Sequence, residues 1–191
     1  MTENIGSQGV AGSADKRFER RVALATAIIA VAMAFSSLGG SNSTKEMLLA
    51  QQQASDQWAF YQAKVIREHL YRTQAEQAKV ALVAQWKTLA PEARKALEGM
   101  QAKFDAEAAR YAKEKKEIEP EAKRLEALRD VAAVRDQNFD YAGVLFQIAI
   151  VLGSIAIISE SRTTVVACLV FGAGAVLLAA NGFLLLVKLP F

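Results

Sequence analysis

Three apolar stretches, separated by one long charged stretch and one short polar turn, divide the 191 residues of this chain. The apolar stretches cover residues 22–40, 142–159 and 163–188. A helix of roughly 20 apolar residues crosses the hydrocarbon core of a bilayer, so each stretch predicts a transmembrane helix. We therefore expect an all-α protein with three transmembrane helices, whose first partner is the lipid bilayer.

The charged stretch, residues 41–141, predicts a long helical hairpin outside the membrane. From Thr44 to Leu89 it contains neither Pro nor Gly and consists largely of strong helix formers. Pro91 and Glu92 favour the start of a second helix, because Pro fits the first helical position and an acidic side chain complements the helix N-terminus. Two arms of nearly equal length around a turn near 90–92 predict an antiparallel, coiled-coil-like stalk, with a shorter bent bundle as the alternative.

The second arm carries a seven-residue repeat, which is typical of a coiled-coil seam. Met100 and Leu128 are expected to add to that seam. Pro120 interrupts the helix without shifting the repeat, so a kink near 120 is expected rather than a reversal of the chain. The repeat consists of Leu97, Phe104, Tyr111, Ile118, Leu125, Ala132 and Phe139, with Glu107, Glu114 and Glu121 expected at its alternate positions.

The first arm carries a weaker apolar stripe, which we expect to face the second arm. Its members are spaced mainly by three, four and seven residues, with a polar interruption from Thr73 to Gln77. Because this stripe is incomplete, part of the apolar surface of the hairpin is expected to remain exposed, which is typical of an interaction site. The stripe consists of Ala59, Ala63, Ile66, Leu70, Val80 and Ala84.

Two segments near the N-terminus are expected to be flexible. Residues 1–21 begin with a stretch rich in Gly, Ser, Asn and Gln, which predicts a mobile tail. Gly39, Gly40 and Ser41 follow the first apolar stretch and are expected to form a hinge before the stalk.

The basic residues before the first apolar stretch predict the orientation of the chain. Lys16, Arg17, Arg20 and Arg21 favour a cytoplasmic N-terminus and a periplasmic stalk. The alternative for the first stretch is a secretory signal peptide cleaved near Ala34-Phe35-Ser36. We favour a retained anchor, because the apolar run is longer than a usual signal core.

Composition and motifs argue against catalysis and against nucleic-acid binding. The formal net charge is only +3, and both signs alternate through the stalk. Cys168 lies inside an apolar stretch and His69 lies among charged residues, neither at the spacing of metal ligands. With no nucleophile beside a base and no phosphate loop, we expect no enzyme activity, no cofactor and no small-molecule substrate.

Two features of the apolar stretches predict packing between helices. Gln147 and Asn181 are the polar residues placed deepest in the last two stretches, and amides in hydrocarbon need hydrogen-bond partners. A substrate or ion site is their alternative role. Small residues spaced by four and three on the third stretch permit close approach of another helix. They are Cys168, Gly172, Ala175, Ala179 and Gly182.

An aromatic cluster early in the stalk, Trp58, Phe60, Tyr61 and Tyr71, predicts packing against the second arm or a protein contact. The surrounding sequence, QASDQWAFYQAK at residues 53–64, resembles a family of bacterial membrane proteins known only as a domain of unknown function. Members of that family carry a similar ASD-x-WA-(F/Y)-YQAK stretch after the first span. The resemblance covers most of the chain and implies a bacterial inner-membrane location, but it implies no reaction, cofactor or site.

Taken together, the patterns predict a membrane-anchored structural or protein-interaction protein whose stalk mediates self-association or binds a protein partner. The alternative is an accessory subunit or a pore-forming component of a membrane transport system. The residues expected to make the contacts of the stalk are Trp58, Tyr61, Leu97, Phe104, Tyr111, Ile118 and Leu125.

Overall fold

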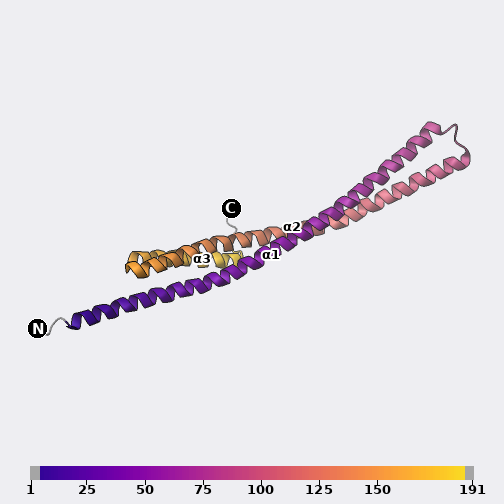
Figure 1. Ribbon diagram of the computed structural model, residues 1–191. Coiled ribbons are helices and arrows are strands. Elements are labelled where there is room, and N and C mark those ends of the chain that lie inside the picture. The colour runs from indigo at the N-terminus through magenta and orange to yellow at the C-terminus, as the bar shows by residue number, and fades with distance from the viewer. Residues whose placement is uncertain (1–4, 188–191) are drawn as a thin grey trace. The chain divides into compact units, whose positions relative to one another are not determined.

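The computed structural model describes the backbone of residues 5–187 and the side chains of residues 16–187. This part of the chain forms three helices and no strand: α1 (Ile5–Gln85), α2 (Pro91–Ser159) and α3 (Arg162–Leu184) (Figure 1). Each helix contains a segment long and apolar enough to cross a membrane. The predicted all-helical class with three such segments is therefore confirmed for the described residues.

The chain divides into two compact units. The hairpin unit is Leu48–Arg129, and the apolar unit contains the residues up to Met47 and from Asp130 onward. The hairpin unit holds the last part of α1, the loop 86–90 and the first part of α2. The apolar unit holds the first part of α1, the last part of α2 and all of α3.

The two arms of the hairpin unit run antiparallel (Figure 1). Far from the loop, the Arg129 guanidinium donates to the Gln51 side-chain oxygen at 3.1 Å, and nearer the loop Lys64 donates to Glu114 at 2.5 Å. Helix α1 ends at Gln85, whose carbonyl accepts the amides of both Thr88 and Leu89 in the turn that follows. At 1.5 Å per residue each arm is roughly 57 Å long.

Helix α1 includes both segments near the N-terminus that were expected to be flexible. It begins at Ile5, so residues 5–21 of the predicted tail are helical, and residues 1–4 lie outside the described part. Extending a formed helix adds one hydrogen bond per residue without a second nucleation cost. The expected hinge is wrong, because α1 passes without interruption through Gly39 and Gly40, and both are buried.

Helix α2 is likewise continuous, with Pro120 inside it. The second arm therefore does not fold back, and the bent bundle considered as an alternative does not form. Pro120 and Lys116 are both exposed, so water can satisfy the Lys116 carbonyl that loses its helical partner. The same helix continues beyond residue 141 to Ser159, so no break separates the second arm from the second apolar stretch.

The apolar unit packs its three helical segments around a core of mostly small residues. Ile29 of α1, Phe146 of α2 and Cys168 of α3 belong to one buried cluster. Ser161 caps α3, its hydroxyl accepting the Thr164 amide at 3.4 Å. At the other end α3 stops at Leu184, earlier than the expected residue 188.

The early end of α3 has a local cause. Leu185 adopts a left-handed conformation with φ of 49°, and its amide donates to the Asn181 carbonyl at 2.7 Å. The Asn181 side chain then exchanges two hydrogen bonds of 2.9 Å with the backbone of Val187. A side chain that binds the backbone in this way competes with continued helix.

Candidate interaction surface

The inner seam of the hairpin, the set of residues through which its arms face each other, follows a strict heptad spacing of four and three. On α2 it confirms the predicted repeat: Tyr111 and Leu125 are buried, and Leu97, Phe104 and Ile118 are half-buried. The alternate positions are not the expected glutamates. They are Gln101, Ala108, Lys115 and Ala122, of which Ala108 and Ala122 are buried.

The seam on α1 consists mainly of small, polar, charged and aromatic residues rather than the predicted apolar stripe. Their spacing matches that of α2, so each faces the second arm despite its polarity. The residues at these spacings, all of them buried or half-buried, are Ala50, Ala54, Gln57, Tyr61, Lys64, Glu68, Tyr71, Ala75, Ala78 and Leu82.

Two ion pairs cross the middle of the seam and offset the cost of burying its charged residues. The Glu68 side chain is 5% exposed, and its carboxylate lies 2.5 Å from the Lys115 ammonium and 3.2 Å from the Arg72 guanidinium. Lys64 pairs with Glu114 at 2.5 Å. The Lys115 ammonium lowers the pKa of Glu68, and Lys64 lowers the pKa of Glu114, so both carboxylates are held in the charged form.

An aromatic layer lies beside these ion pairs. The Tyr71 ring stacks on Tyr111 with centroids 5.7 Å apart, and it also contacts Phe104 at 6.1 Å. Cations surround the Tyr111 ring, with Arg110 at 4.7 Å and Lys64 at 5.3 Å from its centroid. Aromatic and charged layers therefore hold the arms together where a long aliphatic seam is missing.

Most of the residues predicted to make the contacts of the stalk lie inside this seam, where they contact the other arm of the same hairpin. Trp58 donates from its indole nitrogen to Glu126 across the hairpin at 2.9 Å, and its ring meets Tyr61 edge to face at 5.3 Å. Packing against the second arm, one of the two roles predicted for the aromatic cluster, holds for Trp58, Tyr61 and Tyr71. Phe60 is 52% exposed and does not share that environment.

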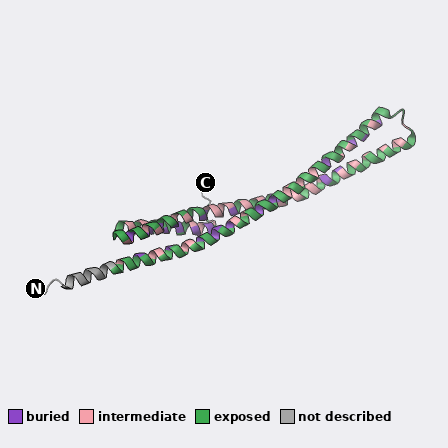
Figure 2. Ribbon diagram, in the orientation of Figure 1, coloured by how far each residue is buried: buried purple, intermediate pink, exposed green. Residues whose placement is uncertain are grey.

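The apolar stripe of α1 lies on the outer face of the hairpin, which corrects the sequence-based expectation. Ile66 is 66% exposed and Leu70 is 53% exposed, and both Ala59 and Ala63 are exposed. Val80 and Ala84 continue the stripe beyond the polar break and are exposed too. Met100 and Leu128 of α2, expected in the seam, are also exposed. Green exposed segments follow both arms in Figure 2.

Close packing in the apolar unit depends on the small residues predicted on the third stretch. Cys168, Gly172, Ala175, Ala179 and Gly182 are the residues that α3 buries. A Cβ at Gly172 would lie 2.9 Å from the Ile29 side chain, and one at Gly182 would lie 2.9 Å from the Phe139 ring. These residues therefore face α1 and α2 of the same chain.

Phe139 is the centre of a contact that sequence reasoning missed. A Cβ at Gly39 would lie 2.7 Å from the Phe139 ring, and one at Gly40 would lie 3.1 Å from the Phe139 Cβ. The ring also meets Phe183 edge to face at 4.8 Å. The two glycines of α1 thus make room for an aromatic ring within a continuous helix.

The expected pairing of amides is only partly correct. Asn181 donates to the side chain of Asn138 on α2 at 2.9 Å, and Asn138 is buried. Gln147 is exposed instead, at the edge of a recess of about 450 Å³. The sequence does not predict Asn138 as the partner of Asn181, because Asn138 lies in the charged stretch, four residues before the second apolar stretch begins.

That recess in the apolar unit has a partly polar lining. Thr44 donates to Asp136 at 2.6 Å on its wall, and Asp140, Ser37 and Gln147 also line it. Among the described residues, no group of three or more His, Cys, Asp or Glu side chains is placed to hold a metal ion. His69 is exposed on the hairpin.

Comparison with known proteins gives one result. The family model described as Domain of unknown function (DUF4337) matches residues 18–185, which is most of the chain. No curated protein and no solved structure matches the chain.

Proposed function

This chain belongs to the DUF4337 family, which is defined by a domain of unknown function. We propose that it is a membrane-anchored assembly protein rather than an enzyme. In this proposal the three apolar segments hold it in a bacterial inner membrane. The hairpin unit then joins copies of the chain side by side through the outer stripe of α1.

The observation that carries the proposal is the exposure of Ala59, Ala63, Ile66 and Leu70 at spacings of four, three and four. The seam of the same arm is already occupied by α2, so the outer stripe is available to another helix. Copies inserted in one membrane share an orientation, and their first arms therefore run parallel. A four-three spacing of apolar residues is what two parallel helices need to pack together.

The mass of the detergent-solubilised protein, measured by light scattering over a range of concentrations, tests the proposal. We expect a dimer or larger assembly for the natural sequence and a monomer for Ile66→Gln combined with Leu70→Gln. Met100→Gln with Leu128→Gln is the matched control, since it removes two exposed apolar side chains from the other arm. Two results would contradict the proposal. One is a monomer of the natural sequence at all concentrations, and the other is an Ile66→Gln, Leu70→Gln variant that stays helical and keeps the mass of the natural assembly.

The proposed orientation places the N-terminus in the cytoplasm and the hairpin in the periplasm. Lys16, Arg17, Arg20 and Arg21 directly precede the first apolar segment and support this assignment. Thr88→Cys puts a thiol in the exposed loop of the hairpin. Together with Cys168→Ser, it should react with an impermeant maleimide on intact spheroplasts, and protection until lysis reverses the assignment.

A role in transport is the second candidate, and the recess lined by Asp136, Asp140 and Gln147 is the observation that favours it. Polar side chains next to membrane-spanning segments often mark an ion or substrate pathway. Ion flux into liposomes that hold the purified protein separates the two candidates. A conductance that disappears with Asp136→Asn and Asp140→Asn favours transport over assembly alone.

A further inference from the structure

The excess positive charge of the hairpin unit is concentrated at its tip, residues 79–103. The tip carries five basic residues against two acidic ones, Glu92 and Glu98, whereas the remainder of the unit carries ten of each sign. Four of the five are lysines, and all four are exposed. The basic residues are Lys79, Lys87, Arg94, Lys95 and Lys103.

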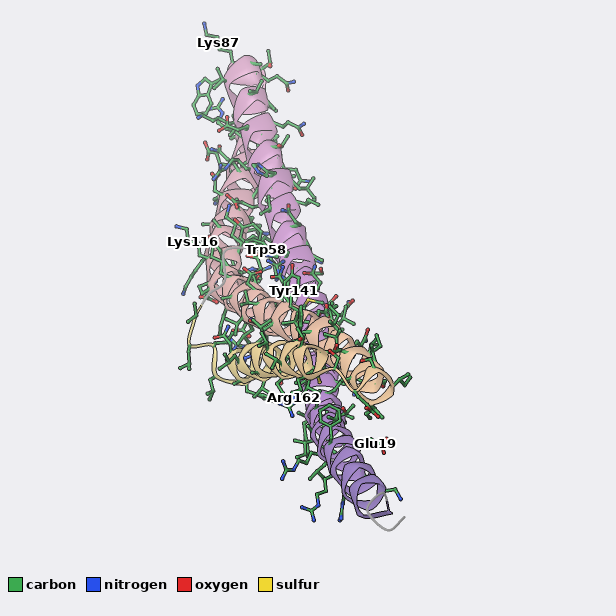
Figure 3. The ribbon with its side chains drawn as sticks, turned by 90° about the vertical axis from the view of Figure 1, so that its left-hand side faces the viewer. Glu19, Trp58, Lys87, Lys116, Tyr141 and Arg162 are labelled. Atoms are coloured by element: carbon green, nitrogen blue, oxygen red, sulfur yellow. The ribbon has the colours of Figure 1, made fainter. Side chains whose placement is uncertain are left out.

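The exposed lysines of the tip have no acidic partner among the described residues, whereas several cations of the shaft do. On the shaft, Lys115 pairs with Glu68 and Lys123 with Glu119, at 2.5 and 2.6 Å. The exposed tip lysines form no such ion pair with any residue that the structure describes. Lys87 stands at the free end of the hairpin and Lys116 along its shaft (Figure 3). The tip therefore presents uncompensated charge.

Apolar side chains accompany this charge at the same end. Val83 is 75% exposed and Trp86 is 48% exposed. The Arg94 guanidinium lies over the Trp86 ring, 3.9 Å from its centroid, and donates to the Trp86 carbonyl at 2.6 Å. Beside them is an open recess of about 800 Å³, which Leu82, Val83 and Trp86 line together with Lys79 and Lys87. The tip thus combines an apolar hollow with a rim of ammonium groups.

We propose that the hairpin tip docks onto an anionic lipid surface, with phospholipid head groups at the lysines and acyl chains against the apolar recess. Lys on a polar rim with Trp and aliphatic residues beside it is the composition of segments that lie in a membrane interface. The attraction of each Lys to an anionic surface acts through space and needs no fixed partner geometry.

The choice of side chains favours lipid over an acidic protein as the occupant. Carboxylate recognition on proteins commonly uses Arg, whose planar guanidinium makes two parallel hydrogen bonds. Arg94 is the one arginine of the tip, and it is already held against Trp86. The four exposed lysines recur every eight residues and surround the loop, as a diffuse anionic surface requires.

Co-sedimentation with lipid vesicles tests this inference on the full chain held in phosphatidylcholine nanodiscs. We expect binding to vesicles that contain phosphatidylglycerol, little binding to phosphatidylcholine vesicles, and loss of binding at high salt. Lys87→Glu with Lys95→Glu should weaken binding by tenfold or more, because each basic residue contributes roughly fivefold near an anionic surface. Lys113→Glu with Lys116→Glu, an equal change of charge on the exposed shaft, should retain it.

Trp86→Ser tests the apolar part of the binding separately from the charge. It should weaken binding to anionic vesicles while leaving the salt dependence unchanged, because the lysines remain. Equal binding to both kinds of vesicle, or an equal loss in the tip and shaft variants, overturns the inference. Absence of vesicle binding together with saturable binding to polyglutamate also overturns it, in favour of an acidic protein partner. Unchanged helicity and mass of each variant separate these results from misfolding and from loss of self-assembly.

Discussion

Tyr71 of the first arm lies flat against Tyr111 of the second, with ring centroids 5.7 Å apart and ring planes 8° from parallel. Tyr111 is buried and Tyr71 is half-buried, so this stack is one of the main apolar contacts between the arms. It joins residues forty positions apart in the sequence.

A double-mutant cycle on this pair measures the contact. Tyr111→Ala should destabilise the hairpin unit by about 3 kcal/mol, as large-to-small changes of buried aromatics do. The stack itself should appear as a coupling of about 1 kcal/mol between Tyr71→Ala and Tyr111→Ala. Hydrogen exchange of amides in residues 48–129 reports the change in the full chain. Additive effects of the two substitutions contradict a direct stack.

Removing Lys115 should be more harmful than removing both members of its ion pair. Lys115→Met leaves the Glu68 carboxylate in the seam with Arg72 alone, and we expect a loss of roughly 2–3 kcal/mol. Lys115→Met with Glu68→Leu replaces the buried pair by apolar side chains and should recover most of that loss. Thermal unfolding followed by circular dichroism gives the comparison. A double variant less stable than Lys115→Met contradicts this account of the seam.

The hairpin should lose stability in acid. Lys115 lowers the pKa of Glu68 and Lys64 lowers that of Glu114, below the ordinary value of 4.5. The unfolded chain then takes up protons before the folded one, so stability is full above about pH 5 and falls as the pH drops through the lowered values. Unfolding measured as a function of pH should show this slope.

The matched variant for the acid prediction is Glu68→Gln with Glu114→Gln. It should be less stable at neutral pH and should show a flatter pH dependence, because the two lowered carboxylates are gone. Glu119 and Glu121 also have lowered pKa values, through Lys123 and Arg124, but they are more exposed and their pairs contribute less. An undiminished slope in the variant assigns the acid sensitivity to other groups.

Gly39 is expected to tolerate a methyl group poorly. A Cβ there lies 2.7 Å from the Phe139 ring and 2.8 Å from Phe183, so Gly39→Ala should destabilise the apolar unit by about 1–3 kcal/mol. Gly143→Ala is the control, since its Cβ meets nothing within 4 Å and alanine favours the helix by about 1 kcal/mol. Thermal unfolding in detergent distinguishes them. Equal stability of both variants contradicts the tight contact.

The seam of the second arm was predictable because its large residues recur every seven positions, and Leu97, Tyr111 and Leu125 do lie there. The seam of the first arm was not, because Lys64 and Glu68 have the polarity of surface residues. Their burial depends on Glu114 and Lys115, about fifty positions away. A single sequence does not reveal such pairs, and its apolar pattern points to Ile66 and Leu70 instead.

The glycines show a second limit of sequence reasoning. Gly39 and Gly40 have the composition of a hinge, but the same absence of a side chain also permits close approach of an aromatic ring. Which of the two applies depends on Phe139, a hundred residues later in the chain. The ridge on α3 was easier to predict, because Gly172, Ala175 and Ala179 repeat at helical spacing on one face.

The ion pair between Glu68 and Lys115 also fixes the register of the hairpin. The neighbours of Lys115 one heptad away are Ala108 and Ala122, both buried. A slip of one arm by seven residues would keep most apolar layers matched but would place the Glu68 carboxylate against a methyl group. Burying that carboxylate without its cation costs far more than an exchange of one apolar layer for another. The alignment of the arms is therefore encoded in the seam rather than in the loop, so residues 86–90 can vary in length and sequence without misaligning them.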